Sequence, residues 1–576
     1  MKKISEIINQ SGYPRLCING EIQNGLAYIT YLTENNRYMD FAKAGYRLFS
    51  VPVFFGFNHL NEYSGLDVFK NGIFDKDAPD FSVFDEDIKQ ILVACPEAYI
   101  FPRVNVSLSR KWEFQNPDEL CAPYSDGTQS RASFASDKWA EEVKREMCAF
   151  ITHVKESGYS SHIVGYQIAG GNTEEWLPFD RDKGISGKRA AEKFARYVET
   201  KGIEASEPNF YRFYSELIAD RIIEFSSLVK RLTDRRLVVG TFYGYTLSCP
   251  YRSYGHHALL KILESEEVDF ICSPVCYSNN RKVGRDHPYM PALTSIKHHG
   301  KLYFSENDTR THLSHAVNDT EWYNKPIWFG PDAETSCEVI KMHAARALIN
   351  GHAAWWFDMW GGWFADNTYM DLLKDIRKLF EKSLSINMRS VTQTAVFVDE
   401  ESYALISNAS VTKNVCYNIR EALGKMGAPY DIYLSADAPS VIARYKAIIS
   451  LVPVETELSD RVKKLAEQNR CSFIEITNEN YDIAPSELRA FLQSAGGGVY
   501  CERDAVIYAN DSFIFLHTAE DGEYTLNVKS PEGLVDVLTG KPFIQGQYLK
   551  KGKSFILSCA KVNDEISINC DFDGEE

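Results

Sequence analysis

The sequence predicts an α/β protein in three parts: a (β/α)8 barrel, a smaller three-layer α/β domain and a small antiparallel β domain. The first observation is that eight short apolar runs alternate with amphipathic helical stretches from residue 14 to about residue 385. The second is a shorter strand–helix alternation after residue 385, and the third is a tail of alternating apolar and polar residues. A chain of 576 residues also exceeds what one hydrophobic core usually supports.

The eight apolar runs are typical of parallel strands buried on both faces, because they are continuous rather than alternating. They are RLCIN (15–19), RLFSVPVFF (47–55), AYIFPRVNV (98–106), HIVGYQIAG (162–170), LVVGTFYG (237–244), DFICSPVCY (269–277), KLYFSEND (301–308) and AAWWFDMW (353–360). Helical segments such as residues 137–158 and 210–233 separate them, and in the second the apolar residues recur at steps of three and four. Eight strand–helix units favour a closed barrel over residues 1–385 rather than an open doubly wound sheet.

Two further domains are predicted after residue 385. The segments 393–406, 418–434, 445–455 and 458–476 alternate between strand and helix patterns, which indicates a three-layer α/β domain over residues 386–494. The linker SAGGGVY (494–500) holds three consecutive glycines, which neither a helix nor a strand interior favours. The remaining segment, 495–576, alternates apolar and polar residues between turn signals, as expected of a small β-sandwich.

The composition argues against nucleic acid and membranes as partners. The net charge of −16 opposes binding to phosphate backbones and to anionic lipid surfaces. No segment approaches the roughly 18 apolar residues of a membrane span. The start, MKKISEIINQSGYPRL, lacks the apolar core of a secretion signal, and the 13 widely spaced cysteines are typical of reduced intracellular thiols. These features predict a cytoplasmic protein.

Polar side chains gather at the carboxyl ends of the predicted strands. They are Arg103 and Asn105 at the third strand, Asn172, Glu174 and Glu175 after the fourth, Tyr277 at the sixth, Glu306 and Asp308 at the seventh, and Asp358 late in the eighth. Because the carboxyl ends of all barrel strands converge on one mouth, we expect these residues to face one cavity. Trp356 lies in the tryptophan-rich segment HAAWWFDMWGGWF (352–364), which would add aromatic surface for sugar stacking.

Two carboxylates at the ends of the fourth and seventh strands suit the hydrolysis of a glycosidic bond. One carboxylic acid protonates the leaving oxygen, and the other carboxylate attacks or stabilises the oxocarbenium-like centre. The acid needs a raised pKa, for which Trp176 beside Glu175 offers an apolar wall. The nucleophile must stay ionised, which Arg103 would ensure by reaching Glu306 across the mouth.

Each of these residues also has a purely structural interpretation. Glu174 and Glu175 suit the first turn of a following helix, where carboxylates stabilise the helix dipole. Glu306 and its polar neighbours resemble a capping cluster, and Arg103 suits an ordinary salt bridge. The tryptophan-rich segment suits a plain core. The histidine pairs at 256–257 and 298–299 lack a carboxylate at ligand spacing, so neither a metal site nor a cofactor is expected.

The segments VGYQIAGGNTEEW, FSENDTRTHL, GHAAWWFDMWGGWF and MGAPYDIYL resemble those of clan A glycoside hydrolases, in particular glycoside hydrolase family 42 and its relatives. The resemblance covers most of the chain. It implies a catalytic barrel, a flavodoxin-like middle domain similar to that family's trimerisation domain, and a short β domain. It also implies an acid/base after the fourth strand and a nucleophile at the end of the seventh, which Glu306 matches.

The acid/base position departs from the family pattern. In the family, Asn immediately precedes the catalytic Glu, whereas here Asn172 and Thr173 precede two adjacent glutamates. Relatives that end this loop in GEW place the catalytic Glu directly before Trp, which assigns the role to Glu175 and leaves Glu174 as the alternative. Asn172 is then a candidate contact for the 2-hydroxyl of the sugar.

The activity that the resemblance implies is that of a retaining, exo-acting β-glycosidase on oligosaccharides, usually a β-galactosidase, in a homotrimer. Another β-linked sugar, such as mannose, glucose or fucose, is an alternative because the loop departs from the pattern. A catalytically inactive, carbohydrate-binding barrel is a second alternative, which the displaced motif favours and the presence of both carboxylates opposes. A hydrolase or lyase for a non-sugar substrate would need a metal or a phosphate loop, and the sequence shows neither.

Overall fold

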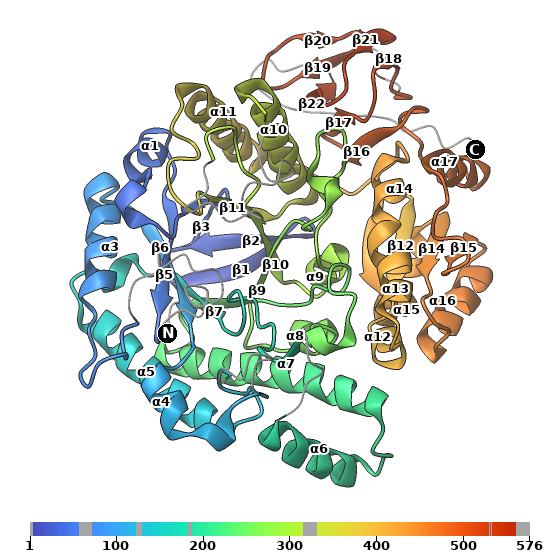
Figure 1. Cartoon of the computed structure of the whole chain (residues 1–576). Coiled ribbons are helices and arrows are strands. Elements are labelled where there is room, and N and C mark those ends of the chain that lie inside the picture. The colour runs from blue at the N-terminus through green and yellow to red at the C-terminus, as the bar shows by residue number, and fades with distance from the viewer. Residues whose placement is uncertain are drawn as a thin grey trace.

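The chain contains the three predicted parts. The computed structural model describes residues 4–56, 72–122, 130–181, 187–314, 331–386, 388–528, 530 and 533–559. The barrel is flanked on one side by the middle α/β domain, while the C-terminal β domain lies over α10 and α11 (Figure 1).

Eight parallel strands close the barrel in the order β10-β11-β4-β5-β6-β7-β8-β9. The strands are β4 (Leu26–Ile29), β5 (Leu48–Phe54), β6 (Tyr99–Asn105), β7 (Gly165–Ala169), β8 (Val238–Phe242), β9 (Phe270–Pro274), β10 (Leu302–Asn307) and β11 (Ala353–Phe357). The helices of this part are α1 (Tyr38–Lys43), α3 (Ser82–Ala94), α4 (Arg110–Gln115), α5 (Asp137–Glu156), α6 (Lys188–Lys201), α7 (Glu207–Leu232), α8 (Leu259–Leu263), α9 (Leu293–His298), α10 (Ala333–Asn350) and α11 (Asn367–Ser383).

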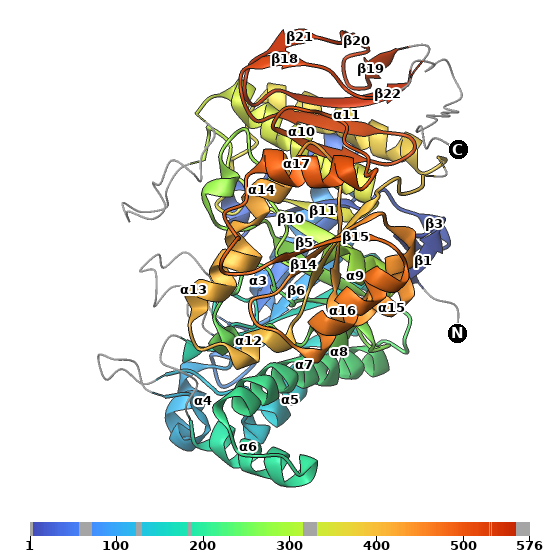
Figure 2. The same cartoon turned by 90° about the vertical axis from the view of Figure 1, so that its right-hand side faces the viewer.

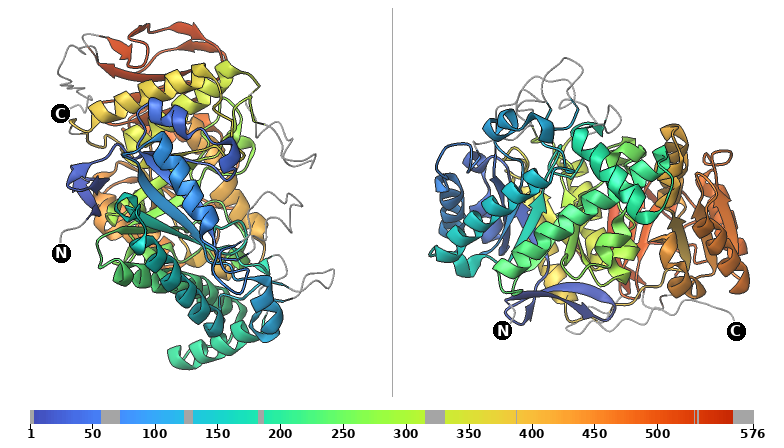
Figure 3. Two further views of the ribbon diagram at one scale, coloured as in Figure 1. Left: turned by 90° about the vertical axis from the view of Figure 1, so that its left-hand side faces the viewer. Right: turned by 90° about the horizontal axis from the view of Figure 1, so that it is seen from below.

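The first predicted barrel strand was wrong. The run at 15–19 belongs to β2 (Tyr13–Ile18), which pairs antiparallel with β1 (Ser5–Gln10) and β3 (Glu21–Ile22) in a separate sheet. Figures 2 and 3 show this sheet at one end of the barrel. β2 is buried along its whole length, so its apolar run looks like a barrel strand in sequence. The true first strand, β4, has only four residues and therefore gives a weaker signal.

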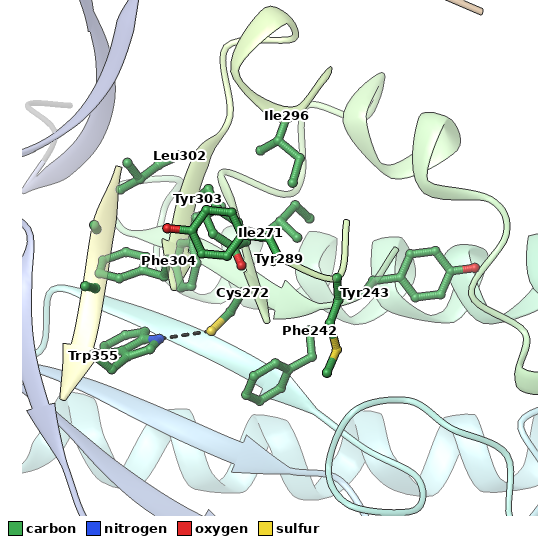
Figure 4. Packing of buried hydrophobic residues seen from close by; sticks show 14 of the residues in the cluster. Phe242, Tyr243, Ile271, Cys272, Tyr289, Ile296, Leu302, Tyr303, Phe304 and Trp355 are labelled. Carbon is green, nitrogen blue, oxygen red and sulfur yellow. Dashed lines mark hydrogen bonds between the residues drawn. The ribbon is translucent and has the colours of Figure 1, made fainter. Parts of the chain in front are cut away.

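The interior of the barrel is filled by alternate side chains of its strands, as the two-residue period of a strand requires. Phe101 of β6, Phe304 of β10 and Trp355 of β11 pack together, with Phe304 stacked on Trp355 at a ring distance of 4.3 Å. The Trp355 indole N–H donates to Cys272 Sγ at 2.9 Å (Figure 4). This layer forms the floor beneath the strand ends.

The middle domain is a parallel sheet in the order β13-β12-β14-β15, which is the flavodoxin-like order. Its strands are β12 (Thr394–Val398), β13 (Asp431–Leu434), β14 (Ala447–Leu451) and β15 (Ser472–Ile476). Its helices are α12 (Glu401–Leu405), α13 (Ala409–Thr412), α14 (Arg420–Lys425), α15 (Ala438–Val441), α16 (Glu457–Gln468) and α17 (Pro485–Ser494). In Figures 1 and 2, α12 lies next to α7 and α8 of the barrel.

The C-terminal domain has an antiparallel sheet in the order β16-β17-β22-β19-β20 and a two-stranded sheet of β18 and β21. Its strands are β16 (Ala505–Ala509), β17 (Ile514–Thr518), β18 (Gly522–Tyr524), β19 (Leu534–Asp536), β20 (Pro542–Phe543), β21 (Gln547–Leu549) and β22 (Ser554–Cys559). The domain is tied to α10, where Glu338 accepts from Ser554 N at 2.7 Å. The exact domain boundaries and a sandwich arrangement of the two sheets stay predictions.

The cysteines mostly fit the expectation of free thiols. Eleven cysteines in the described part of the chain are free, whereas Cys559 is disulfide-bonded. The expectation of reduced thiols is therefore wrong at Cys559. Within the described residues, no helix combines the length and the apolar character that crossing a membrane would demand.

Candidate active site

The segment 170–177 turns sharply at the carboxyl end of β7. Thr173, Glu174 and Trp176 all have positive φ values, of 60°, 67° and 59°. The turn is closed by its own backbone, since Trp176 N donates to Gly170 O at 2.7 Å and Asn172 N to Leu177 O at 2.8 Å. Each such backbone conformation costs on the order of 1–3 kcal/mol outside glycine and persists only where the surroundings impose it. Three of them in four residues mark this turn as a functional candidate.

Trp176 anchors this turn from below. Its side chain is 0% exposed, and its indole N–H donates to Ile168 O at 3.2 Å. The ring packs against Phe134 and Phe225, at ring distances of 5.4 and 6.2 Å. Trp176 therefore contacts the core, rather than forming the predicted apolar wall beside the Glu175 carboxylate.

The two adjacent glutamates have different partners. Glu174 is 0% exposed; it accepts from the Tyr31 hydroxyl and from Asn105 Nδ2, the latter at 3.3 Å. Glu175 is half-buried, and it accepts from Tyr245 Oη at 2.9 Å and from Thr173 Oγ1 at 2.7 Å. Neither glutamate lies at the start of a helix. In the described residues, the next helix along the chain is α6, which begins at Lys188. The helix-dipole interpretation of this pair is therefore wrong.

Glu306 makes the contact that the sequence analysis expected. Arg103 Nη2 lies 2.5 Å from Glu306 Oε2, and both side chains are buried. The guanidinium is held by Gln167 Oε1, which accepts from Arg103 Nε at 3.1 Å, and by the rings of Phe242 and Phe357. A buried guanidinium needs a counter-ion, so this geometry suits a charged pair.

Burial raises the pKa of all three glutamates, but different neighbours oppose the rise. Burial raises the pKa of Glu175 to about 7, against hydrogen bonds from Thr173 and Tyr245 that lower it. Burial also raises the pKa of Glu306, and the charge of Arg103 opposes that rise. Burial likewise raises the pKa of Glu174, again against Arg103. The negative charges of Asp308 and Glu175 also raise the pKa of Glu306, so Glu175 and Glu306 are close enough to influence each other's ionisation.

A second polar group lies at the ends of β9 and β10. Asp308 is ion-paired with Arg281 at 2.7 Å and accepts from the Tyr277 hydroxyl at 2.6 Å. The Arg281 guanidinium also lies 4.1 Å from the centre of the Tyr277 ring. Tyr277 is 40% exposed although its hydroxyl is held in this way. It is thus a fixed, accessible aromatic face next to the carboxylates.

Two predicted binding residues are not brought into this group. Trp356 is 1% exposed and donates to Tyr46 Oη at 3.1 Å, on the helix side of β11, while Trp355 fills the barrel interior. Asp358 is fully buried and accepts from Tyr28 Oη, Gly362 N and Trp363 N. Asp358 therefore holds the turn after β11. The prediction missed this because a strand alternates its faces, and residues 356 and 358 share the outer one.

Sequence reasoning also missed two tyrosines. Tyr31 follows β4, a strand that the sequence analysis did not recognise, so its position at the mouth was hidden. Tyr245 follows β8, and its only sequence signal is a polar aromatic residue just past a strand end. No group of three His, Cys, Asp or Glu side chains within the described residues is arranged to hold a metal ion. The site thus consists of carboxylates, amides, tyrosines and arginines.

Several solved structures of glycoside hydrolases have a similar architecture. A β-galactosidase from Bacillus circulans sp. alkalophilus superposes with a TM-score of 0.62 at 13% identity, covering 93% of this chain and 98% of that one. The chain has the fold of these enzymes. A family 42 β-galactosidase from G. stearothermophilus gives a TM-score of 0.60 at 10% identity, over 96% of this chain and 99% of that one. A family 42 exo-carrageenase from Bacteroides ovatus gives 0.56 at 13% identity, over 99% and 85%.

The likeness at these identities is one of fold, including the barrel and the additional sheets. No family model matches the sequence, and no curated protein matches it.

Proposed function

We propose that this chain is a glycoside hydrolase, more specifically a retaining, exo-acting β-glycosidase with β-galactosidase activity. The observation that carries the proposal is that Glu175 and Glu306 lie at the ends of β7 and β10 with different partners, hydroxyl groups for Glu175 and a guanidinium for Glu306. Glu306 lies 2.5 Å from a buried guanidinium, whereas no ion pair to Glu175 is found among the described residues. β-Galactosidases among the structures of similar fold support the choice of sugar.

In the proposed reaction, a Glu306 oxygen attacks the anomeric carbon while Glu175 gives its proton to the glycosidic oxygen. The bond between the anomeric carbon and that oxygen breaks, and the sugar is left esterified to Glu306. Glu175, now ionised, removes a proton from water, and the hydroxide oxygen displaces Glu306 with a second inversion. Arg103 holds Glu306 ionised before attack and as the leaving carboxylate afterwards.

The remaining residues around the carboxylates are assigned to sugar binding. Asn105 and Glu174, joined at 3.3 Å, are proposed to bind hydroxyl groups, with Asn172 from the same turn. Tyr277 is proposed to stack on a sugar ring, because its face is accessible and Asp308 fixes its hydroxyl.

The test is hydrolysis of aryl glycosides of several sugars, in both anomers, by the wild type, Glu306→Gln and Glu146→Gln. Glu146 is a buried carboxylate on α5, outside the candidate site. Glu146→Gln therefore makes the same Glu-to-Gln change at a buried position and serves as the control. We expect the wild type and Glu146→Gln to cleave one β-glycoside, and Glu306→Gln to lose at least about 10³-fold in kcat. Circular dichroism shows whether both variants are folded.

Three outcomes would contradict the proposal. Substantial activity in folded Glu306→Gln removes this residue as the nucleophile. A first-formed α-anomer, observed by proton NMR during the reaction, contradicts retention. A folded wild type that binds oligosaccharides in calorimetry but cleaves none of them favours the carbohydrate-binding alternative.

A further inference from the structure

The loop after β8 is held by the middle domain. This loop, residues 243–250, is called the Tyr245 loop because Tyr245 is the member that contacts Glu175. Thr246 Oγ1 donates to Glu400 at 3.1 Å, and the Tyr403 hydroxyl donates to Thr246 O. Further bonds from the middle domain run from Thr412 Oγ1 to Pro250 O at 2.6 Å and from Arg420 Nη2 to Ser248 Oγ at 3.3 Å.

Glu400 is the centre of this contact. It lies two residues after the end of β12, at the carboxyl end of the middle domain's sheet. Besides Thr246, it accepts from the backbone N–H groups of Leu259 at 3.0 Å and Leu260 at 3.3 Å, at the start of α8. Three donors therefore converge on one carboxylate. Burial raises the pKa of Glu400 to about 7, and these hydrogen bonds favour its ionised form.

We propose that Glu400 is a positioning residue for the reaction, holding the Tyr245 loop so that the Tyr245 hydroxyl donates to Glu175. This inference builds on the proposed function, in which Glu175 is the acid/base. Tyr245 is buried, and its hydroxyl lies 2.9 Å from Glu175, so a shift of the loop backbone would change this distance. The middle domain is then part of the catalytic unit rather than an attached module.

The effect on Glu175 has a definite direction. A hydroxyl that donates to a carboxylate stabilises its ionised form, so the Tyr245 bond lowers the pKa of Glu175. Asp308 raises the pKa of Glu175 and Arg181 lowers it, and Glu306 and Tyr277 also lie in its field. Weakening the Tyr245 bond should raise the pKa of Glu175 and move the alkaline limb of kcat/KM to higher pH.

The experiment is a double-mutant cycle with Tyr245→Phe and Glu400→Gln, read out as the pH profile of kcat/KM. Each single variant should move the alkaline limb upward by about 0.5–1 pH unit, the effect of one hydrogen bond. The double variant should match Tyr245→Phe alone, because Glu400 acts through Tyr245. An unchanged limb in folded Glu400→Gln, or additive shifts in the double variant, would overturn the proposal.

Glu401→Gln is the matched control. Glu401 is the next residue and pairs with Arg212 of α7 at 2.5 Å, across the same domain boundary. Its contacts among the described residues are with Arg212 and Asp399 and not with the Tyr245 loop, so its substitution should leave the limb in place. If Glu400→Gln does not fold, Thr246→Val replaces it in the double-mutant cycle, because this variant removes the hydrogen bond from Thr246 to Glu400.

A structural readout separates this proposal from the proposed function. If the wild type shows no hydrolysis, the crystal structures of the wild type and Glu400→Gln still test the link. Loss of the 2.9 Å contact between Tyr245 Oη and Glu175 in the variant supports the positioning role. Its persistence, with the loop unmoved, overturns that role.

Discussion

At the scale of single residues, the question that matters most is which of two neighbouring glutamates transfers the proton. Glu174 is fully buried between Tyr31 and Asn105, whereas Glu175 is half-buried and bonded to Tyr245. The acid/base exchanges its proton with solvent in every turnover, which the more exposed of the two carboxyl groups does more readily. This requirement favours Glu175, the residue directly before Trp176.

The assignment predicts different behaviour for two alanine variants. Glu175→Ala should slow substrates with poor leaving groups by about 10²–10⁴-fold and activated aryl glycosides much less. Azide should partly restore the activity, because it fits the space of the lost carboxylate and needs no proton. Glu174→Ala should instead raise KM without azide rescue. If azide rescues Glu174→Ala and not Glu175→Ala, the acid/base is one residue earlier than proposed.

The pH profile follows from the same carboxyl group. Burial raises the pKa of Glu175 to about 7, and the acid must be protonated to act. Activity should therefore be present below about pH 7 and should fall as the pH rises through that value. Glu175→Gln, measured on an activated substrate, should lack this alkaline limb. A wild-type profile that stays flat from pH 6 to pH 9 would contradict the role of Glu175.

At the scale of elements, the turn at 170–177 depends on one glycine. Gly171 has a φ of +72°, and a Cβ atom there would lie 2.5 Å from Leu177 O. We expect Gly171→Ala to lower the free energy of unfolding by about 1–2 kcal/mol for the backbone conformation and by a further 1–3 kcal/mol for the contact. Urea denaturation measures the sum of the two losses as one change in the free energy of unfolding.

Gly202 provides the control for this substitution. Its φ is +63° at the end of α6, but among the described residues an added Cβ would meet no atom within 4 Å outside its own chain neighbours and helix backbone. Gly202→Ala should lose only the part that comes from the backbone conformation. Equal losses in the two variants would mean that the close approach to Leu177 contributes nothing. A loss of activity in Gly171→Ala alone would link the turn to the position of Glu175.

At the scale of the whole molecule, the prediction concerns assembly. The resemblance of the middle domain to a trimerisation domain leads us to propose a homotrimer of 65.5 kDa chains. Sedimentation equilibrium should give three times the mass of one chain, at a protein concentration well above nanomolar. A mass of 65.5 kDa would contradict the proposal. The cytoplasmic location also stays a prediction, which cell fractionation would test.

Much of the fold was predictable because apolar periodicity reports burial directly. Seven of the eight predicted barrel runs overlap barrel strands, and the middle domain has the predicted alternation. The exception is instructive. β2 covers one end of the barrel and is as apolar as a barrel strand, while the short β4 is not conspicuous. Periodicity reports that a run is buried, but not against which partner.

The sequence by itself determined the fold class and the position of Glu175 and Glu306 at strand ends, because the carboxyl ends of the strands converge in any closed barrel. Only the tertiary structure showed that Glu174 and Glu175 face different partners, since three positive φ values decide where each side chain points. It also removed Trp356 from the mouth, placed the Tyr245 hydroxyl against Glu175 and joined Glu400 to Thr246 of the same loop. Such contacts join residues more than 60 positions apart, and their geometry comes from packing that no local pattern records.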